Sequence, residues 1–168
     1  MRPLCVAFIG PGEGALPSDI SLAEVIAETV VSRYGAFVVT GGLGGVMAAA
    51  ARGATRAGGV AIGITPGGEA GAAHEAHSYT VATGMGEARN AVVVNSAHIV
   101  IAIGLGWGTA SEIALARRAG KQVLQIDGFL PAEAGLTSWS SDGRTLEEMA
   151  GLVLDWLEPL VTVRPDAR

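Results

Sequence analysis

The 168-residue sequence predicts an α/β fold built on a mostly parallel sheet. Short apolar runs, typical of buried strands, alternate with helical patterns along the chain. The 25 glycines are about twice the number expected from average usage, and many follow directly after the apolar runs. Hydrophobic residues make up 49% of the chain and charged residues only 16%, which excludes a disordered chain. The glycines have no strict three-residue period, which excludes collagen.

The first half of the chain predicts four strands and three helices. Leu4–Ile9 is a continuous apolar run, which indicates a buried parallel strand. Ser18 or Asp19 is predicted to cap a helix that reaches about Arg33. The further strands are expected at Ala36–Thr40, Val60–Ile64 and Ser78–Ala82, the further helices at Val46–Ala57 and Gly86–Ser96, and an exposed loop over residues 67–76.

The second half continues the same alternation. His98–Ile103 is the second strong strand pattern, followed by a helix over Ala110–Ala119 and a strand over Gln122–Ile126. Phe129–Gly143 is predicted to be a loop. Thr145 and Glu148 have capping-box spacing for a last helix that reaches about Leu157, and Pro159 with the polar 164–168 tail is expected to end the domain. Residues 1–168 are therefore expected to form one domain.

Charge and cysteine content exclude several classes of function. The net charge is −5 and the basic residues form no run longer than two, so a nucleic-acid partner is not expected. The single Cys5 excludes an internal disulfide and is expected to be a buried, inert thiol. His74, His77 and His98 form no metal-binding pattern, so no metal site is expected. No segment has the pattern of a signal peptide or membrane helix, and we expect a cytoplasmic protein without a membrane partner.

Three glycine clusters follow predicted strands, at Gly10–Gly14, Gly41–Gly45 and Gly104–Gly108. In parallel α/β sheets, ligands bind beyond the carboxyl ends of the strands, where these clusters lie. Glycine loops before helices expose backbone N–H groups that bind small anions. Tight turns and close helix packing are the structural alternatives, and Trp107 either covers a planar ring or packs on the protein. The residues expected to bind a ligand are Gly10, Gly12, Gly41, Gly42, Gly45, Gly104, Gly106, Trp107, Gly108 and Thr109.

Other motifs of nucleotide and acyl chemistry are absent from the sequence. There is no Walker A motif and no G-x-S-x-G nucleophile elbow. The glycine motif at residues 104–109 follows a late strand, so it is a poor match to a dinucleotide fingerprint. Lys121 is the single lysine, and a pyridoxal-phosphate lysine decarboxylase is therefore not expected.

The glycine loops and two charged residues together resemble a known superfamily. The stretch Thr40–Met47, followed by Gly53, then Arg89-Asn90, then Gly106–Glu112, resembles the LOG (LONELY GUY) superfamily over about residues 4–127. Within that superfamily the chain is similar to a short branch that includes the molybdenum cofactor carrier protein. The resemblance implies a Rossmann-like, doubly wound fold with helices on both faces of the sheet, and a homodimer or homotetramer.

The resemblance implies two functions. LOG enzymes hydrolyse the N-glycosidic bond of nucleoside 5′-monophosphates without a cofactor, and Arg89 and Glu112 match their catalytic residues. The carrier branch binds a pterin that carries a phosphate and a dithiolene-held molybdate, and needs no catalysis. Gly104, Leu105 and Asn90 depart from the enzyme motif. We therefore expect a binding protein for a phosphate-bearing ligand, either the molybdenum cofactor or a nucleoside monophosphate, with a phosphoribohydrolase as the alternative.

Overall fold

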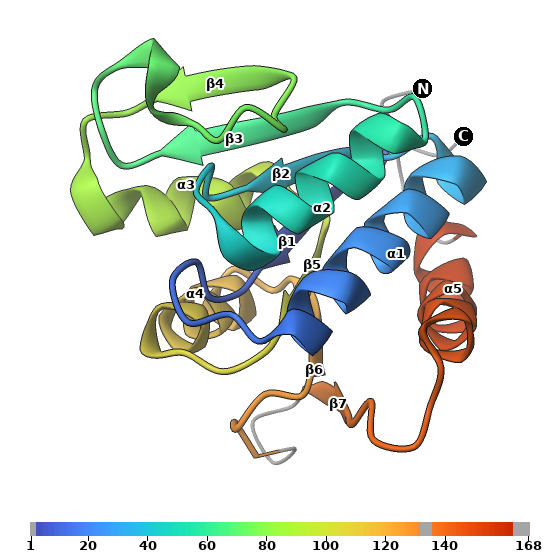
Figure 1. The fold of residues 1–168 in the computed structure, drawn as a ribbon. Coiled ribbons are helices and arrows are strands. Elements are labelled where there is room, and N and C mark those ends of the chain that lie inside the picture. The colour runs from blue at the N-terminus through green and yellow to red at the C-terminus, as the bar shows by residue number, and fades with distance from the viewer. Residues whose placement is uncertain (1–2, 132–135, 163–168) are drawn as a thin grey trace.

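The computed structural model describes residues 3–131 and 136–162, and the strands in these ranges form one parallel sheet (Figure 1). Seven described strands pair in the order β4-β3-β2-β1-β5-β6-β7, and every pair is parallel, which confirms the predicted sheet. The strands are β1 (Cys5–Ile9), β2 (Phe37–Thr40), β3 (Ala61–Thr65), β4 (Tyr79–Ala82), β5 (Ile99–Ile103), β6 (Gln122–Ile126) and β7 (Thr137–Trp139).

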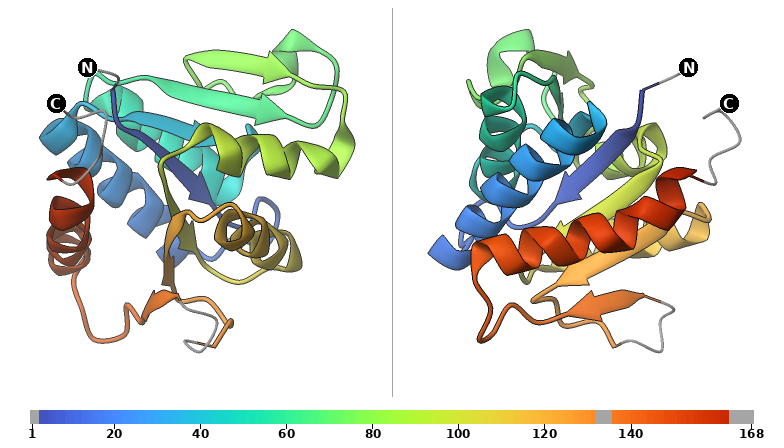
Figure 2. Two further views of the ribbon diagram at one scale, coloured as in Figure 1. Left: turned by 180° about the vertical axis from the view of Figure 1, so that it is seen from behind. Right: turned by 90° about the vertical axis from the view of Figure 1, so that its right-hand side faces the viewer.

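Helices cover both faces of the sheet, as the Rossmann-like prediction required (Figure 2). One face carries α1 (Pro17–Tyr34), α2 (Gly45–Arg56) and α5 (Leu146–Thr162), and the other carries α3 (Asn90–Ser96) and α4 (Trp107–Arg118). Two short 3-10 helices, η1 (Ala70–Ala72) and η2 (Gly86–Arg89), complete the described elements.

Side-chain alternation along the central strands explains the two-sided core. Val6 and Phe8 of β1 pack under α1, α2 and α5, whereas Ala7 and Ile9 point to the face of α3 and α4. Because both faces are covered, these strands are apolar without interruption, which is the pattern that made β1 predictable.

The start of α1 differs from the prediction. The helix begins at Pro17, and Leu16 is its N-cap, so neither Ser18 nor Asp19 occupies the capping position. The physical reason is that Pro17 is suited to the first helical position, where no N–H is required. Asp19 lies in the first turn, and its Oδ2 accepts a hydrogen bond of 3.2 Å from the Leu16 N–H.

The last helix begins as predicted. The Glu148 N–H donates to Thr145 Oγ1 at 3.2 Å, and the Thr145 N–H donates to Glu148 Oε2 at 2.8 Å, which confirms the capping box. The helix runs to Thr162, so Pro159 lies inside it and does not end it. Residues 160–162 continue the helix after this proline, and the predicted 164–168 tail lies outside the described residues.

Two further predictions were wrong in detail. The predicted loop Phe129–Gly143 contains β7, which pairs with β6 through Leu124 and Thr137, while residues 132–135 of that loop lie outside the described ranges. The three-residue length of β7 leaves too short a pattern to recognise. Cys5 is only half-buried, because it is the first residue of β1. It therefore lies at the amino ends of the strands, opposite the glycine loops.

The order of the strands reverses between β1 and β5, which both lie in the centre of the sheet. The loops that follow these two strands therefore diverge and leave space between them, which is where ligands bind in doubly wound sheets. None of the helices in residues 3–131 and 136–162 is long and apolar enough to cross a membrane.

Candidate functional site

A cavity of about 450 Å³ lies beyond the carboxyl ends of β1 and β5. The loop after β1, the η2 segment before α3, and the start of α4 form its walls. This volume is within the usual range for small-molecule sites. The lining residues are Gly10, Pro11, Gly12, Glu13, Gly14, Leu43, Met47, Pro66, Glu87, Arg89, Asn90, Leu105, Gly106, Gly108, Thr109 and Glu112.

Arg89 supplies a buried positive charge to this cavity. The residue is only 7% exposed. Its Nη2 donates to the Gly41 carbonyl at 3.1 Å, and its Nη1 donates to the side-chain oxygen of Asn90. Its Nε is buried and has no hydrogen-bond partner in the described parts of the chain. Burial lowers the pKa of Arg89, but an arginine remains charged at neutral pH.

Glu112 lies beside Arg89, and it is also 7% exposed. Its Oε1 is 3.8 Å from Arg89 Nη1, so the structure brings the two predicted catalytic residues together. Burial raises the pKa of Glu112 to about 7, although the nearby Arg89 lowers it. The carboxyl group therefore changes its protonation near neutral pH, as a general acid or base does.

The helix α4 begins at the same cavity, which Gly106, Gly108 and Thr109 line. It begins at Trp107 with Gly106 as N-cap, three residues earlier than predicted. Glu112 is therefore in the second turn and not the first, and Thr109 lies inside the helix without capping it. The first N–H groups of an α-helix have no partner within the helix and attract anions.

The glycine loops divide into two groups. Gly10, Gly12, Gly106 and Gly108 line the cavity, so their backbones are open to a ligand. The others predicted to bind, Gly41, Gly42, Gly45 and Gly104, are outside this lining.

Gly45 shows what the second group does. Its φ is +59°, and a Cβ there would lie 2.4 Å from the Pro11 carbonyl oxygen. The next residue, Val46, donates its N–H to the same oxygen at 3.1 Å. Gly45 therefore lets the start of α2 pack against the loop after β1, which is the close-packing alternative.

Trp107 lies outside the lining of this cavity. Its side chain is 83% exposed, and its ring meets Phe129 edge-on with centroids 5.3 Å apart. The structure therefore separates Trp107 from Gly106, Gly108 and Thr109, which line the cavity.

His77 has a structural contact. Its Nε2 is 2.7 Å from Thr40 Oγ1, and this oxygen also accepts the Gly42 N–H at 3.0 Å. Burial lowers the pKa of His77, which favours the neutral ring. In the described ranges, no group of three or more His, Cys, Asp and Glu side chains is arranged to hold a metal ion.

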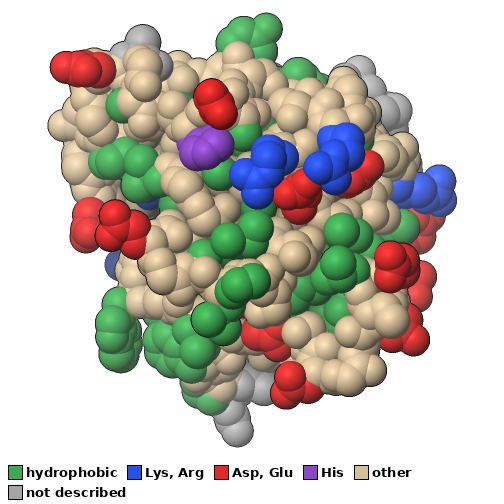
Figure 3. Space-filling model, in the orientation of Figure 1, with side chains coloured by type: hydrophobic (Ala, Val, Ile, Leu, Met, Phe, Trp, Pro, Cys, Tyr) green, Lys and Arg blue, Asp and Glu red, His purple; other side chains and the backbone are tan. Residues whose placement is uncertain are grey.

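Outside the cavity, arginines on the face of α1 and α2 are paired with acids (Figure 3). Arg52 Nε is 3.0 Å from Glu24, and Arg56 Nη1 is 3.2 Å from Glu28. These partly exposed charges are neutralised locally, whereas Arg89, which lines the cavity, has a buried Nε–H without a partner in the described ranges.

Sequence reasoning missed the acidic residues of the site. Glu13 and Glu87 line the same cavity as Arg89. Asp19 and Asp127 line a neighbouring cavity. Glu13 lies in the loop after β1, Glu87 in η2, Asp19 in the first turn of α1, and Asp127 directly after β6. All four places lie at the carboxyl edge of a parallel sheet, and this position is the signal that could have pointed to them.

Comparison with known proteins defines the class. The model of the SLOG cluster4 family matches residues 3–150, so the chain belongs to this family, and the predicted LOG-type resemblance is confirmed.

Individual relatives agree with this assignment. The molybdenum cofactor binding protein from Rippkaea orientalis is 31% identical, with a TM-score of 0.79 over 94% of this chain and 99% of that one. The molybdenum cofactor carrier protein from Chlamydomonas reinhardtii is 30% identical, with a TM-score of 0.77 and the same coverage. An uncharacterized protein from Archaeoglobus fulgidus is 36% identical over 126 residues, which are 75% of this chain and 82% of the relative.

Proposed function

We propose that this protein binds a phosphate-bearing small molecule in the manner of a molybdenum cofactor carrier. One observation carries the proposal. Arg89 is buried against the cavity with its Nε unpartnered, although a buried polar group without a partner destabilises a fold. A phosphate oxygen at this N–H would satisfy it, and the first-turn amides of α4 supply further donors.

The binding mode follows from the lining of the cavity. Gly106 and Gly108 have no side chain to block an anion, and Thr109 contributes a hydroxyl. Leu105, which departs from the enzyme motif, is 54% exposed and also lines the cavity rim. Similarity to carrier proteins over nearly their whole length supports the same class of ligand.

A binding experiment tests this proposal. Titration calorimetry with ribose 5-phosphate is expected to show binding to the wild-type protein. Arg89→Gln should weaken it at least about tenfold, because hydrogen bonds to a charged group contribute about 1.5–3 kcal/mol. Arg118→Gln, at the exposed end of α4, is the control and should leave affinity unchanged. Equal affinity in all three proteins would overturn the proposal.

A phosphoribohydrolase is the second candidate, and the Arg89–Glu112 pair favours it. A carboxyl group with a pKa of about 7 beside an arginine is suited to stabilise a developing positive charge on ribose or to activate water. Incubation with AMP and with cytokinin riboside monophosphates tests this function through release of free base. Release that is lost in Glu112→Gln would establish the enzyme, and no release would leave the carrier-type function.

We also propose that the chain is one domain that self-associates as a homodimer or homotetramer. Tyr79 and Val81 are exposed apolar side chains on β4, at the edge of the sheet. Exposed apolar edge strands favour pairing with another chain. Analytical ultracentrifugation of Val81→Lys against wild type tests this proposal, and a wild-type monomer would contradict it.

A further inference from the structure

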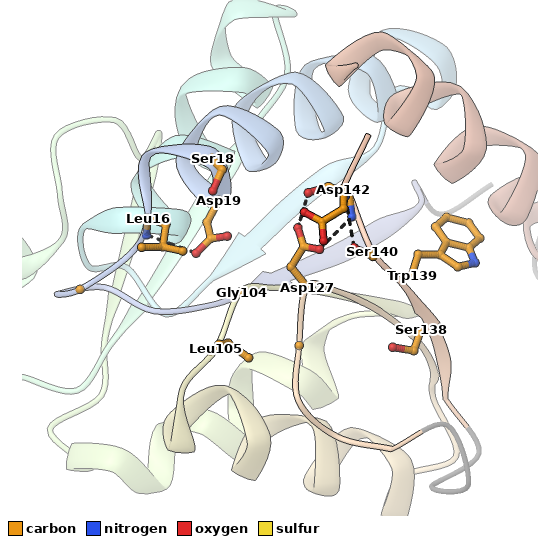
Figure 4. A pocket seen from close by; sticks show the side chains of 13 residues that line it. Leu16, Ser18, Asp19, Gly104, Leu105, Asp127, Ser138, Trp139, Ser140 and Asp142 are labelled. Carbon is orange, nitrogen blue, oxygen red and sulfur yellow. Dashed lines mark hydrogen bonds between the residues drawn. The ribbon is translucent and has the colours of Figure 1, made fainter. Parts of the chain in front are cut away.

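A second cavity, of about 760 Å³, adjoins the one that contains Arg89. Both cavities are lined by Gly14 and Leu105, so they share a rim at the carboxyl edge of the sheet. The second cavity extends from the start of α1, past Gly104, to the segment that follows β7 (Figure 4). A ligand anchored beside Arg89 therefore has room to extend across this rim.

The chemical character of the second cavity is opposite to that of a phosphate site. Its described lining contains no Lys, Arg or His side chain. Its side chains are instead rich in hydrogen-bond acceptors, with the carboxyl groups of Asp19, Asp127 and Asp142 and the hydroxyls of Ser18, Ser138, Ser140 and Ser141. With no cationic side chain among the described lining residues, these three carboxyl groups repel an anion and favour a group that presents N–H donors.

Asp19 is the buried member of this set, at 3% exposure. Its Oδ2 accepts the Leu16 N–H, and its Oδ1 has no donor in the described parts of the chain. Burial, with a contribution from the charge of Asp127, raises the pKa of Asp19. Because no described cation pairs with this carboxyl group, a donor from a ligand would compensate its burial.

Asp127 is held in a fixed orientation. Its Oδ1 accepts the Ser141 N–H at 2.8 Å, and its Oδ2 accepts the Ser141 hydroxyl at 2.5 Å. A carboxylate has about four acceptor sites, so each oxygen can accept another hydrogen bond. Because Asp127 lines the second cavity, a ligand there can supply N–H donors to these oxygens.

We propose that the second cavity binds the donor edge of a nitrogen heterocycle, in which a ring N–H lies next to an exocyclic amino group, with Asp19 and Asp127 as its acceptors. This inference rests on the proposed function, because the phosphate beside Arg89 fixes the other end of the ligand. The 2-amino-4-oxopyrimidine ring has such an edge, and it occurs in both guanine and pterins. Adenine lacks this edge, since its ring nitrogen next to the amino group is an acceptor.

Matched ligands test the heterocycle separately from the phosphate. Calorimetric titrations compare GMP, neopterin monophosphate, AMP and ribose 5-phosphate on the wild-type protein. GMP, neopterin monophosphate or both should bind at least about tenfold tighter than AMP, as one bidentate pair discriminates between bases by this amount. The preferred ligand then identifies guanine or pterin as the source of the ring.

The variants assign this preference to the carboxyl groups. Asp127→Asn should abolish the preference over AMP and leave ribose 5-phosphate affinity unchanged. Asp19→Asn, which retains an acceptor for the Leu16 N–H, gives the same test if Asp127→Asn does not fold. Asp155→Asn, an exposed acid on α5, controls for the change in net charge.

Two results would overturn the inference, and they differ from failure of the proposed function. Equal binding of GMP, neopterin monophosphate and AMP excludes donor-edge recognition, as does a preference that survives both aspartate variants. In either case, Arg89-dependent binding of ribose 5-phosphate leaves the proposed function standing. Absence of ribose 5-phosphate binding to the wild-type protein overturns both.

Discussion

Replacement of Glu112 by glutamine is expected to change how stability depends on pH. Glu112 is buried next to Arg89, and burial raises its pKa from the ordinary 4.5 to about 7. Below pH 4.5 the carboxyl group is protonated in both the folded and the unfolded chain. Between these values it ionises in the unfolded chain first, so the folded state binds more protons and loses stability as pH rises.

The size of this effect follows from the two pKa values. Each tenfold change in a protonation equilibrium corresponds to about 1.4 kcal/mol, so the interval from 4.5 to about 7 gives about 3 kcal/mol. Glutamine does not titrate. The free energy of unfolding of Glu112→Gln should therefore rise relative to wild type by about 3 kcal/mol between pH 4.5 and pH 8.

Urea unfolding of both proteins at intervals across this pH range measures the difference. Glu75→Gln, an exposed loop variant, is the control and should follow wild type within about 0.5 kcal/mol at every pH. If the Glu112→Gln difference is flat across the range, the inferred protonation of Glu112 is wrong.

Three further substitutions test the described packing. Gly45→Ala should lower the free energy of unfolding by at least about 2 kcal/mol in urea, because φ is +59° and carbonyl oxygens occupy the space of a Cβ; no loss would mean that this packing is wrong. Thr145→Ala should remove the capping bond to Glu148 and lower the melting temperature by about 2–4 °C, and an unchanged melting temperature would contradict the cap. Gln125→Leu should cost about 2 kcal/mol in urea, since Leu130 and Ser138 lose partners, and a neutral effect would argue against these bonds.

The sheet was predictable because its strands are buried on both faces. Phe8 and Ile9 of β1 point to opposite cores, so the whole strand is apolar and contrasts with the glycine loop that follows. The same logic failed for β7, which is three residues long and contains Ser138, a residue that bonds to Gln125. Hydrogen bonds of this kind between distant residues leave no local pattern in the sequence.

The candidate site was predictable in part. Motif resemblance identified Arg89 and Glu112, and the structure places them 3.8 Å apart. The same approach grouped Trp107 with the ligand-binding glycines, although this first residue of α4 is outside the cavity lining and its ring contacts Phe129. The role of each glycine was ambiguous, because the lack of a side chain suits both close packing and ligand binding. Gly45 allows close packing, whereas Gly106 lines the cavity.

The sequence placed Asp19 and Asp127 near the carboxyl edge of the sheet, but it gave no sign that they line one cavity. Asp19 has the position of an ordinary first-turn helix residue, and its burial becomes visible only when Gly104 packs beside its carboxyl group. Asp127 follows β6 and bonds to Ser141, 14 residues further along the chain. Only the folded sheet edge brings these two residues to one cavity.

A crystal structure of the protein grown with ribose 5-phosphate will show where the phosphate group binds. The proposed function predicts a phosphate oxygen within hydrogen-bond distance of Arg89 Nε and of the first-turn N–H groups of α4. A phosphate bound away from this cavity, with Arg89 Nε still lacking a partner, would contradict the proposed function.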